Sequence, residues 1–250
     1  MIEFRNLHKS FGREEVLRGV DLAVREGETL ALLGPSGTGK SVLLKHAIGL
    51  LEPDEGDVIV DGVSISKATP EQLRKVRQRV GYVFQNSALF DSMTVFENLR
   101  LALEGEGERR PLPQLRAEAK ELLARVNLDA EVLDMYPSEL SGGMRKRVGV
   151  ARAIASRPRY LLYDEPTTGL DPVNAQNIDS LIMELREDLG VTGIVVTHDL
   201  DSAFQVADRV ALLHDGRVRA CGLPEEILAS EDPVVARFVR RGRIQPAVAV

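Results

Sequence analysis

The glycine-rich segment Gly34-Pro-Ser-Gly-Thr-Gly-Lys-Ser41 constrains the fold of this chain more than any other stretch. It follows an apolar run at 29–33, which predicts a short buried strand, and it precedes a predicted helix at 41–48. A glycine-rich loop in this context turns its backbone N–H groups, and the positive end of the helix dipole, toward phosphate oxygens. Lys40 adds a charge for the outer phosphates and Ser41 a hydroxyl for Mg²⁺. The residues predicted to hold a nucleotide phosphate are Gly34, Pro35, Ser36, Gly37, Thr38, Gly39, Lys40 and Ser41.

Two acids follow a second apolar run, at 160–163, which predicts another buried strand. Ligands of open α/β sheets bind beyond the carboxyl ends of the strands, and Asp164 and Glu165 come at that end. Asp164 is expected to hold Mg²⁺ through water, and Glu165 to polarise the water that attacks a terminal phosphate. Alone, two acids after a strand more often cap a loop; the glycine-rich segment favours the functional interpretation.

The order of apolar segments predicts strands alternating with helices, and therefore a mostly parallel α/β sheet. Between about 88 and 157 the pattern becomes helical, which predicts an inserted helical lobe interrupted by a polar loop at 104–113. Strands are predicted at 2–8, 16–24, 29–33, 57–60, 80–84, 160–163, 193–197, 209–213 and 218–221; helices are predicted at 41–48, 95–103, 115–126, 172–189 and 200–206.

Composition excludes several classes of protein. Hydrophobic residues make up 44% of the 250 residues and charged residues 28%, which is typical of a globular chain and not of a disordered one. The net charge of −6 disfavours a nucleic-acid-binding role. A single cysteine excludes a disulfide within the chain and fits a reducing compartment. No apolar run approaches about 20 residues, so any membrane is expected to be served from outside the bilayer.

Leu140-Ser-Gly-Gly143, followed by Met144-Arg-Lys-Arg-Val148, resembles the signature motif of ABC-type ATPases and stands in the family's order between the glycine-rich segment and the acid pair. Four single residues add to the resemblance. Phe11 is similar to the aromatic that stacks on adenine, Gln85 to the Q-loop glutamine, Asp171 to the D-loop aspartate and His198 to the switch histidine.

The resemblance implies an α/β P-loop NTPase core of the ABC ATPase type, with an antiparallel β subdomain and an inserted α-helical lobe. The ATPase domain would cover 1–230, with its lobe at about 88–157, and 231–250 would form a C-terminal tail. ATP and Mg²⁺ are the implied ligands. The implied catalytic residues are Glu165, His198, Lys40 and Gln85; the implied metal ligands are Ser41, Gln85 and Asp164; the implied ATP contacts outside the glycine-rich segment are Phe11, Ser141, Gly142, Gly143 and Asp171.

In the family, the signature of one subunit meets the ATP held by the other, so a homodimer is implied. Ser141 is expected to cap the helix that runs to Ala155, with its N-terminus facing an anion. The charged residues of this helix are expected partly to balance phosphate and partly to be ordinary solvated positions; they are Arg145, Lys146, Arg147 and Arg152. Each single-residue assignment has an alternative: Phe11 as core packing, Gln85 as a surface group and His198 as a core histidine.

Several stretches resemble the ATPase of the Mla/MCE lipid-transport systems: 88–99, 135–140, 144–148 and 163–171. The expected function is therefore ATP hydrolysis that powers a separate membrane permease for phospholipid or related lipid. The resemblance implies an MCE-domain lipid-binding subunit as a further partner, and a peripheral location at the cytoplasmic face of the inner membrane. Import of a small polar solute, such as an amino acid, is the alternative. ABC ATPases of DNA repair or translation are disfavoured, because the chain has neither their long insertion nor a second cassette.

Two segments are left with two interpretations each. The apolar residues Phe90, Met93, Val95 and Phe96 are expected either to contact the permease or to pack inside the lobe. The tail from 233 is expected either to be a frayed end or to pack on the second subunit.

Overall fold

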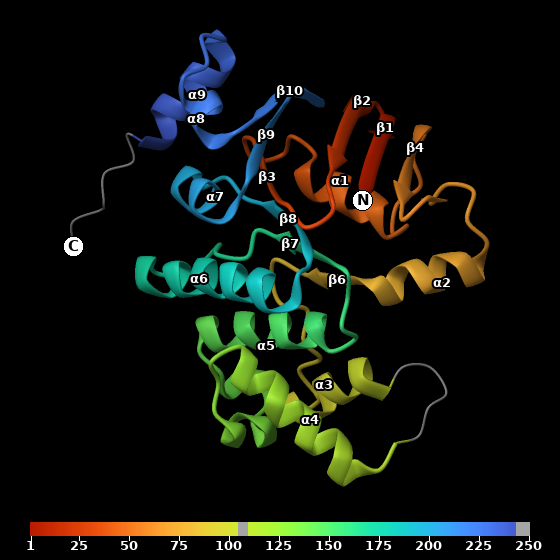
Figure 1. The fold of residues 1–250 in the computed structure, drawn as a ribbon, viewed down its shortest axis with the longest axis vertical. Helices are drawn as coiled ribbons and strands as arrows, with labels where there is room; N and C mark the ends of the chain where they lie inside the picture. Colours follow the sequence, from red (N-terminus) through yellow and green to blue (C-terminus); the bar gives the residue numbers. More distant parts are fainter. Residues whose placement is uncertain (105–109, 244–250) are drawn as a thin grey trace. The chain divides into compact units, whose positions relative to one another are not determined.

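The computed structural model describes residues 1–104 and 110–243 (Figure 1). The chain forms two compact units. The first unit combines Met1–Arg77 with Thr192–Val250, and the second is Gln78–Val191. Helix α2, Pro70–Arg79, crosses this boundary in the sequence, and no helix was predicted there.

An antiparallel sheet occupies the N-terminal part of the first unit. Its strand order is β2-β1-β4-β5. In β2 the inward residues Leu17, Val20, Leu22 and Val24 are buried, while most of their neighbours are exposed, as expected of a sheet with one solvated face. The strands are β1 (Ile2–Phe11), β2 (Glu14–Val24), β4 (Glu55–Val60) and β5 (Val63–Ser64).

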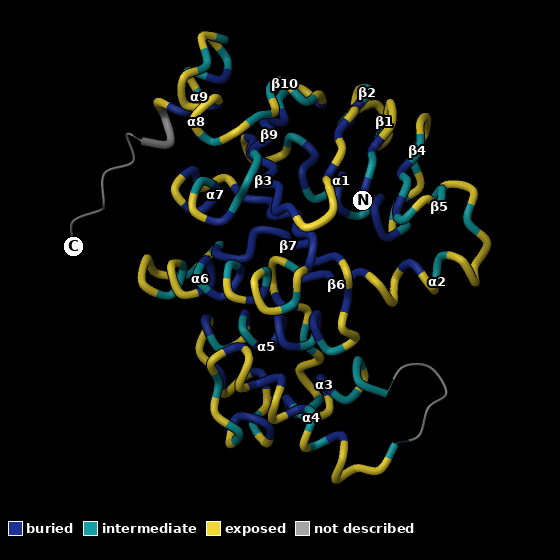
Figure 2. The backbone as a smooth tube through the Cα atoms, in the orientation of Figure 1, coloured by how far each residue is buried: buried dark blue, intermediate teal, exposed yellow. Residues whose placement is uncertain are grey.

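A mixed set of strands in the order β10-β9-β3-β8 forms the rest of the first unit's sheet structure. Strand β3 is parallel to both β8 and β9, and β9 turns antiparallel into β10. Every residue of β3 and β8 is buried, which is why these strands are continuous apolar runs (Figure 2). The elements are β3 (Thr29–Leu33), β8 (Thr192–Val196), β9 (Arg209–His214) and β10 (Arg217–Gly222), with helices α1 (Lys40–Ala47), α7 (Leu200–Val206), α8 (Pro224–Leu228) and α9 (Pro233–Arg243).

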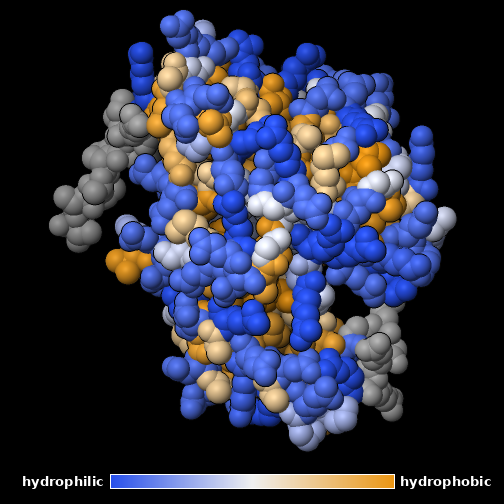
Figure 3. Space-filling model, viewed as in Figure 1, coloured by the Kyte–Doolittle hydropathy of each residue, from blue (hydrophilic) through white to orange (hydrophobic). Residues whose placement is uncertain are grey.

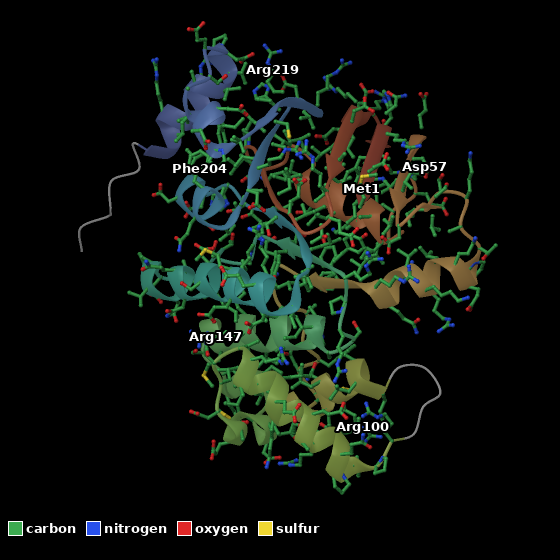
Figure 4. The ribbon with its side chains drawn as sticks, viewed as in Figure 1. Met1, Asp57, Arg100, Arg147, Phe204 and Arg219 are labelled. Carbon is green, nitrogen blue, oxygen red and sulfur yellow. The ribbon has the colours of Figure 1, made fainter. Side chains whose placement is uncertain are left out.

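Helix α9 corrects the expectation of a frayed tail over residues 233–239. Val235 and Val239 are buried in a core cluster that includes Leu33 and Leu212 of the central strands. Phe204 of α7, labelled in Figure 4, packs against the same cluster. Apolar residues spaced four apart on one helical face are enough to anchor this segment. The remainder of the tail, 244–250, lies outside the described residues.

The second unit contains two parallel strands and the helical segment. Strand β6 pairs with β7 from Val80↔Tyr160 to Val83↔Tyr163. All five residues of β7 are buried. The elements are β6 (Val80–Val83), α3 (Val95–Glu104), α4 (Leu112–Arg125), two 3₁₀ helices η1 (Ala130–Asp134) and η2 (Pro137–Glu139), α5 (Gly142–Ile154), β7 (Tyr160–Asp164) and α6 (Pro172–Leu189).

The predicted loop at 104–113 is too long at its C-terminal end. Helix α4 begins at Leu112, so residues 112 and 113 are helical. Pro113 lies in the first turn of α4, which tolerates proline because a backbone N–H at that position would have no partner within the helix. Residues 105–109 of this loop lie outside the described residues.

The visible surface is mainly hydrophilic, with scattered apolar patches (Figure 3). Among the described residues, no helix combines the length and the apolar character needed to cross a membrane.

Candidate nucleotide-binding site

The phosphate loop, residues 34–41, has the backbone that its sequence predicts. Gly37 and Gly39 have φ values of 82° and 96°, in the region that favours glycine. A Cβ atom on Gly39 would lie 2.8 Å from Cγ1 of Val16 in β2, so this residue also needs to be glycine for space. The loop therefore passes tightly over β2 before α1 begins.

Lys40 lies at the first position of α1 and is only 5% exposed. Its Nζ donates hydrogen bonds to the carbonyl oxygens of Gly34, at 2.7 Å, and Pro35, at 3.1 Å. The Thr38 hydroxyl donates to the same Pro35 oxygen at 2.9 Å. These bonds keep the ammonium group against the loop, beside the N-terminus of α1, where an anion is favoured.

The register of β3 and β8 brings His198 to the same sheet edge as the phosphate loop. Leu32 pairs with Val196, and the N–H of Thr197 donates to the Leu32 carbonyl at 3.3 Å. The phosphate loop and His198 both follow the carboxyl ends of these parallel strands. The His198 side chain is exposed, which contradicts the alternative of a core histidine.

Phe11 stands at the end of the β1–β2 hairpin and is 47% exposed. The alternative of core packing is therefore wrong. Lys9 Nζ lies 5.7 Å from the ring centroid. Because Val16 of the same hairpin contacts the phosphate loop at Gly39, the hairpin places an accessible aromatic ring within the unit that carries the loop.

In the second unit, the pairing of Val83 with Tyr163 brings Gln85 and the acid pair to one edge. Asp164 is 5% exposed, and the Tyr82 hydroxyl donates to its Oδ2 at 3.0 Å. Burial first, and then the Asp164 charge, raises the pKa of Tyr82, so this hydroxyl stays a donor at neutral pH. Tyr82 was not among the residues predicted for this site.

Glu165 adopts an uncommon backbone conformation for a non-glycine residue, with φ 50°. Its carboxylate is nearly buried, and Oε2 accepts a hydrogen bond from the Thr168 hydroxyl at 2.9 Å. Backbone strain of this kind costs roughly 1–3 kcal/mol and persists where surrounding contacts impose it. Glu165 thus has an imposed position at the end of β7.

Lys146 corrects the expectation of an ordinary solvated position on α5. It is 7% exposed, and its Nζ donates to the carbonyl oxygens of Gln85, at 2.5 Å, and Glu165, at 3.3 Å. Burial lowers the pKa of Lys146, while the charges of Glu165 and Asp164 oppose that shift. Arg147, labelled in Figure 4, instead donates to the Asn127 carbonyl at 3.0 Å.

The signature residues lie against the start of α6. Ser141 caps α5 as predicted, since its Oγ accepts from the Met144 N–H at 3.2 Å. A Cβ atom on Gly143 would lie 3.0 Å from Oδ1 of Asn174. Asp171 caps α6 and also accepts from the Asn174 amide, and these hydrogen bonds lower its pKa. The signature and Asp171 therefore form one surface of the second unit.

The donor chemistry of the predicted metal ligands fits Mg²⁺. Ser41, Gln85 and Asp164 offer a hydroxyl, an amide oxygen and a carboxylate, which are oxygen ligands of the kind that this ion prefers. The described residues contain no cluster of three or more His, Cys, Asp or Glu that could form an all-protein metal site. Mg²⁺ commonly keeps water and phosphate oxygens, so a small protein ligand set is sufficient.

Comparison with known proteins places these features in one family. Residues 17–168 match the ABC transporter family. Over 98% of its length, the chain is 40% identical to the "Probable ribonucleotide transport ATP-binding protein mkl" of Mycobacterium bovis, and the match covers 68% of that protein. Over 96% of its length, it is 42% identical to the methionine import ATP-binding protein MetN of Caulobacter vibrioides, and the match covers 72% of that protein.

A solved structure supports the same fold. The ATP-binding cassette MJ0796, described as a dimer in a post-hydrolysis state bound to ADP and Pi, superimposes with a TM-score of 0.82 and 33% identity. The match covers 90% of this chain and 99% of that one. The predicted α/β P-loop NTPase core of the ABC ATPase type is therefore confirmed.

Proposed function

Because this chain belongs to the ABC transporter family and hydrolyses ATP, we propose that it powers a separate membrane permease as a homodimer, with the residues predicted above as its catalytic site. The observation that carries the proposal is the phosphate loop, in which Lys40 is held against the loop carbonyls at the start of α1. Loop N–H groups and Lys40 would bind the phosphates, and Phe11 would stack on adenine.

In the proposed reaction, water attacks the γ-phosphate in line with the leaving group. Glu165 orients or deprotonates that water, and His198 contacts the γ-phosphate. Lys40 offsets the charge that develops on the transferred phosphate. Mg²⁺, held by Ser41, Gln85 and Asp164, would neutralise phosphate charge when bound. Gln85 would report the presence of nucleotide to the helical segment of the second unit.

We expect the chain to dimerise when ATP fills the site. Ser141, Gly142 and Gly143 would contact the ATP held by the partner's phosphate loop, and Asp171 would align the two subunits. The exposed position of Ser141 at the N-terminus of α5 supports this, because the N-terminus of a helix favours an anion.

Light scattering tests the dimer. The Glu165→Gln variant is expected to be monomeric without nucleotide and to double its mass with Mg-ATP, because hydrolysis no longer reopens the complex. Ser141→Arg added to Glu165→Gln places a bulky charged side chain at the contact with ATP and should keep the protein monomeric with Mg-ATP. An unchanged mass of Glu165→Gln at saturating ATP would contradict the nucleotide-driven dimer.

A groove in the second unit supports permease docking. It has a volume of about 520 Å³ and is lined by apolar side chains that include Phe84, Phe90 and Leu101. Phe90 is 53% exposed and Leu101 is 51% exposed, although large apolar side chains are usually buried. Val95, by contrast, is fully buried, so the alternative of packing inside the lobe holds for that residue.

Asn98 fixes the shape of the segment that presents Phe90. Its Oδ1 accepts from the Phe90 N–H at 2.8 Å, and its Nδ2 donates to the carbonyls of Phe90, Met93 and Thr94 at 3.0–3.2 Å. A buried amide that meets four backbone groups holds a loop in one conformation. We therefore propose that residues 87–96, beside Gln85, contact the permease.

Cysteine cross-linking tests this contact. In a Cys221→Ser background, Ser92→Cys is expected to cross-link to the permease in assembled membranes, because Ser92 is exposed within the proposed contact. Glu26→Cys, in the exposed turn before β3, is the matched control and should not cross-link. If cysteines placed throughout 87–96 all fail to cross-link, this segment is not the contact.

For the cargo, we propose phospholipid or a related lipid. The support is the likeness of residues 88–99, 135–140, 144–148 and 163–171 to ATPases of Mla/MCE systems. The chain would then act at the cytoplasmic face of the inner membrane. Co-purification from detergent-solubilised membranes should recover a permease together with an MCE-domain protein. Recovery of a permease with a solute-binding protein would instead identify an importer.

Import of a small polar solute is the second candidate. The observation that favours it is the 42% identity to a methionine import ATP-binding protein over almost the whole chain. ATPase activity of the reconstituted complex separates the two, because lipid vesicles alone would supply substrate in the first case, whereas a soluble amino acid with its binding protein would be required in the second.

A further inference from the structure

Helix α5 contacts the loop that follows β6 through Lys146, Gly149 and Arg152, which are three positions apart in the sequence. Arg152 donates from its two terminal nitrogens to the carbonyls of Ser87, at 2.8 Å, and Ala88, at 2.7 Å. Gly149 allows the close approach, since a Cβ there would lie 3.1 Å from Cβ of Ser87. Lys146 holds the start of the same loop at the Gln85 carbonyl.

Lys146 differs from Arg152 because it also reaches a second loop. The same ammonium group donates to the Glu165 carbonyl, at the end of the neighbouring strand β7. Lysine has three donors and no acceptor, so one nitrogen can join two carbonyls. The backbone of Glu165 has the left-handed conformation, and this conformation sets the direction of its carboxylate. The hydrogen bond from Lys146 is made to the carbonyl of this same residue.

A buried lysine at this position costs free energy if its side chain serves only to pack against its neighbours. A buried ammonium group loses hydration, and hydrogen bonds with carbonyl dipoles must replace that hydration. Arg152 and Gly149 already hold the 87–88 part of the loop. What Lys146 adds is a direct link between Gln85 and Glu165.

We propose that Lys146 is a positioning residue that couples the Gln85 loop to the orientation of Glu165. This proposal rests on the roles proposed for Gln85 and Glu165 in hydrolysis. Displacement of the Gln85 carbonyl moves the ammonium group, which moves or releases the Glu165 carbonyl and so redirects its carboxylate. The effect is expected on the chemical step, because the hydrogen bonds of Lys146 go to the backbone carbonyls of Gln85 and Glu165.

Steady-state kinetics of the full chain, measured well below each variant's melting temperature, test the proposal. Lys146→Met is expected to lower kcat about tenfold or more, because small misplacements of a reacting group cost at least that much, while KM and the Kd for Mg-ATP change by less than about twofold. Lys146→Arg, which keeps charge and donors, should recover part of kcat. Lys120→Met, on the exposed face of α4, is the matched control.

Arg152→Gln separates coupling from simple loop support. It releases Ser87 and Ala88 but leaves the link between Gln85 and Glu165, so its loss in kcat should be clearly smaller than that of Lys146→Met. Equal losses in the two variants would overturn the proposal, as would a wild-type kcat in Lys146→Met or a change confined to KM.

Two further arms keep the test decisive. If Lys146→Met does not fold, Lys146→Gln replaces it. The glutamine amide is one bond shorter than the lysine side chain and can reach only one of the carbonyls, so a wild-type kcat would overturn the coupling.

Glu165→Gln distinguishes a failure of the coupling from a failure of the role proposed for Glu165. If Glu165→Gln is inactive and Lys146→Met is normal, only the coupling fails; if Glu165→Gln stays active, the proposed role of Glu165 fails.

Discussion

Glu165→Gln should lower steady-state phosphate release by about a hundredfold or more, while the Kd for Mg-ATP stays within about threefold of wild type. Removal of a general base typically costs 10²–10⁴ in rate. The substitution keeps the size of the side chain, and a glutamine oxygen can still accept the hydrogen bond from Thr168, which wild-type Oε2 accepts at 2.9 Å. Only the ability to take a proton or to orient water as a carboxylate is lost.

Glu187→Gln, an exposed position on α6, is the matched control for loss of one negative charge and should leave hydrolysis unchanged. Phosphate release and nucleotide binding are measured on the same preparations. Activity of Glu165→Gln above about a tenth of wild type would remove this residue as the main catalytic carboxylate.

The parts of the fold predicted from sequence are those that local physics determines. The phosphate loop was predictable because its glycines allow conformations that other residues avoid, and because a buried strand and a helix flank it. The caps at Ser141 and Asp171 follow from short polar side chains before helical patterns. By contrast, α2 was missed because only Val76 is buried along it, so it carries little apolar periodicity.

The contacts that position the acid pair could not be predicted, because they depend on tertiary packing. Tyr82 looks like any aromatic in a buried strand, and its bond to Asp164 arises from the pairing of β6 with β7. Lys146 looks like a solvated residue in a basic helix until the helix packs on the Gln85 loop. The spacing of Lys146, Gly149 and Arg152 was the one signal present, since residues three apart share a helical face.

Gly34→Ala should have the second large effect, a loss of ATP affinity of at least about thirtyfold, or about 2 kcal/mol. A Cβ atom at Gly34 would lie 2.4 Å from the carbonyl oxygen of Leu213, and real Cβ atoms do not come that close to another atom. The obstacle is backbone in β9, which pairs with β3, so no side-chain rotation can relieve it. The loop must shift instead, and the Gly34 carbonyl that accepts from Lys40 shifts with it.

Gly62→Ala is the control that isolates backbone strain from this steric conflict. Gly62 has a φ of 78° in the turn between β4 and β5, and a Cβ atom there would meet nothing within 4 Å, so alanine should cost about 1–2 kcal/mol of folding stability. ATP affinity should be unchanged, because the turn between β4 and β5 is no part of the phosphate loop. Equilibrium nucleotide binding and thermal unfolding of both variants give the comparison. If folded Gly34→Ala binds Mg-ATP as tightly as Gly62→Ala, the close approach of the phosphate loop to β9 is not required for nucleotide binding.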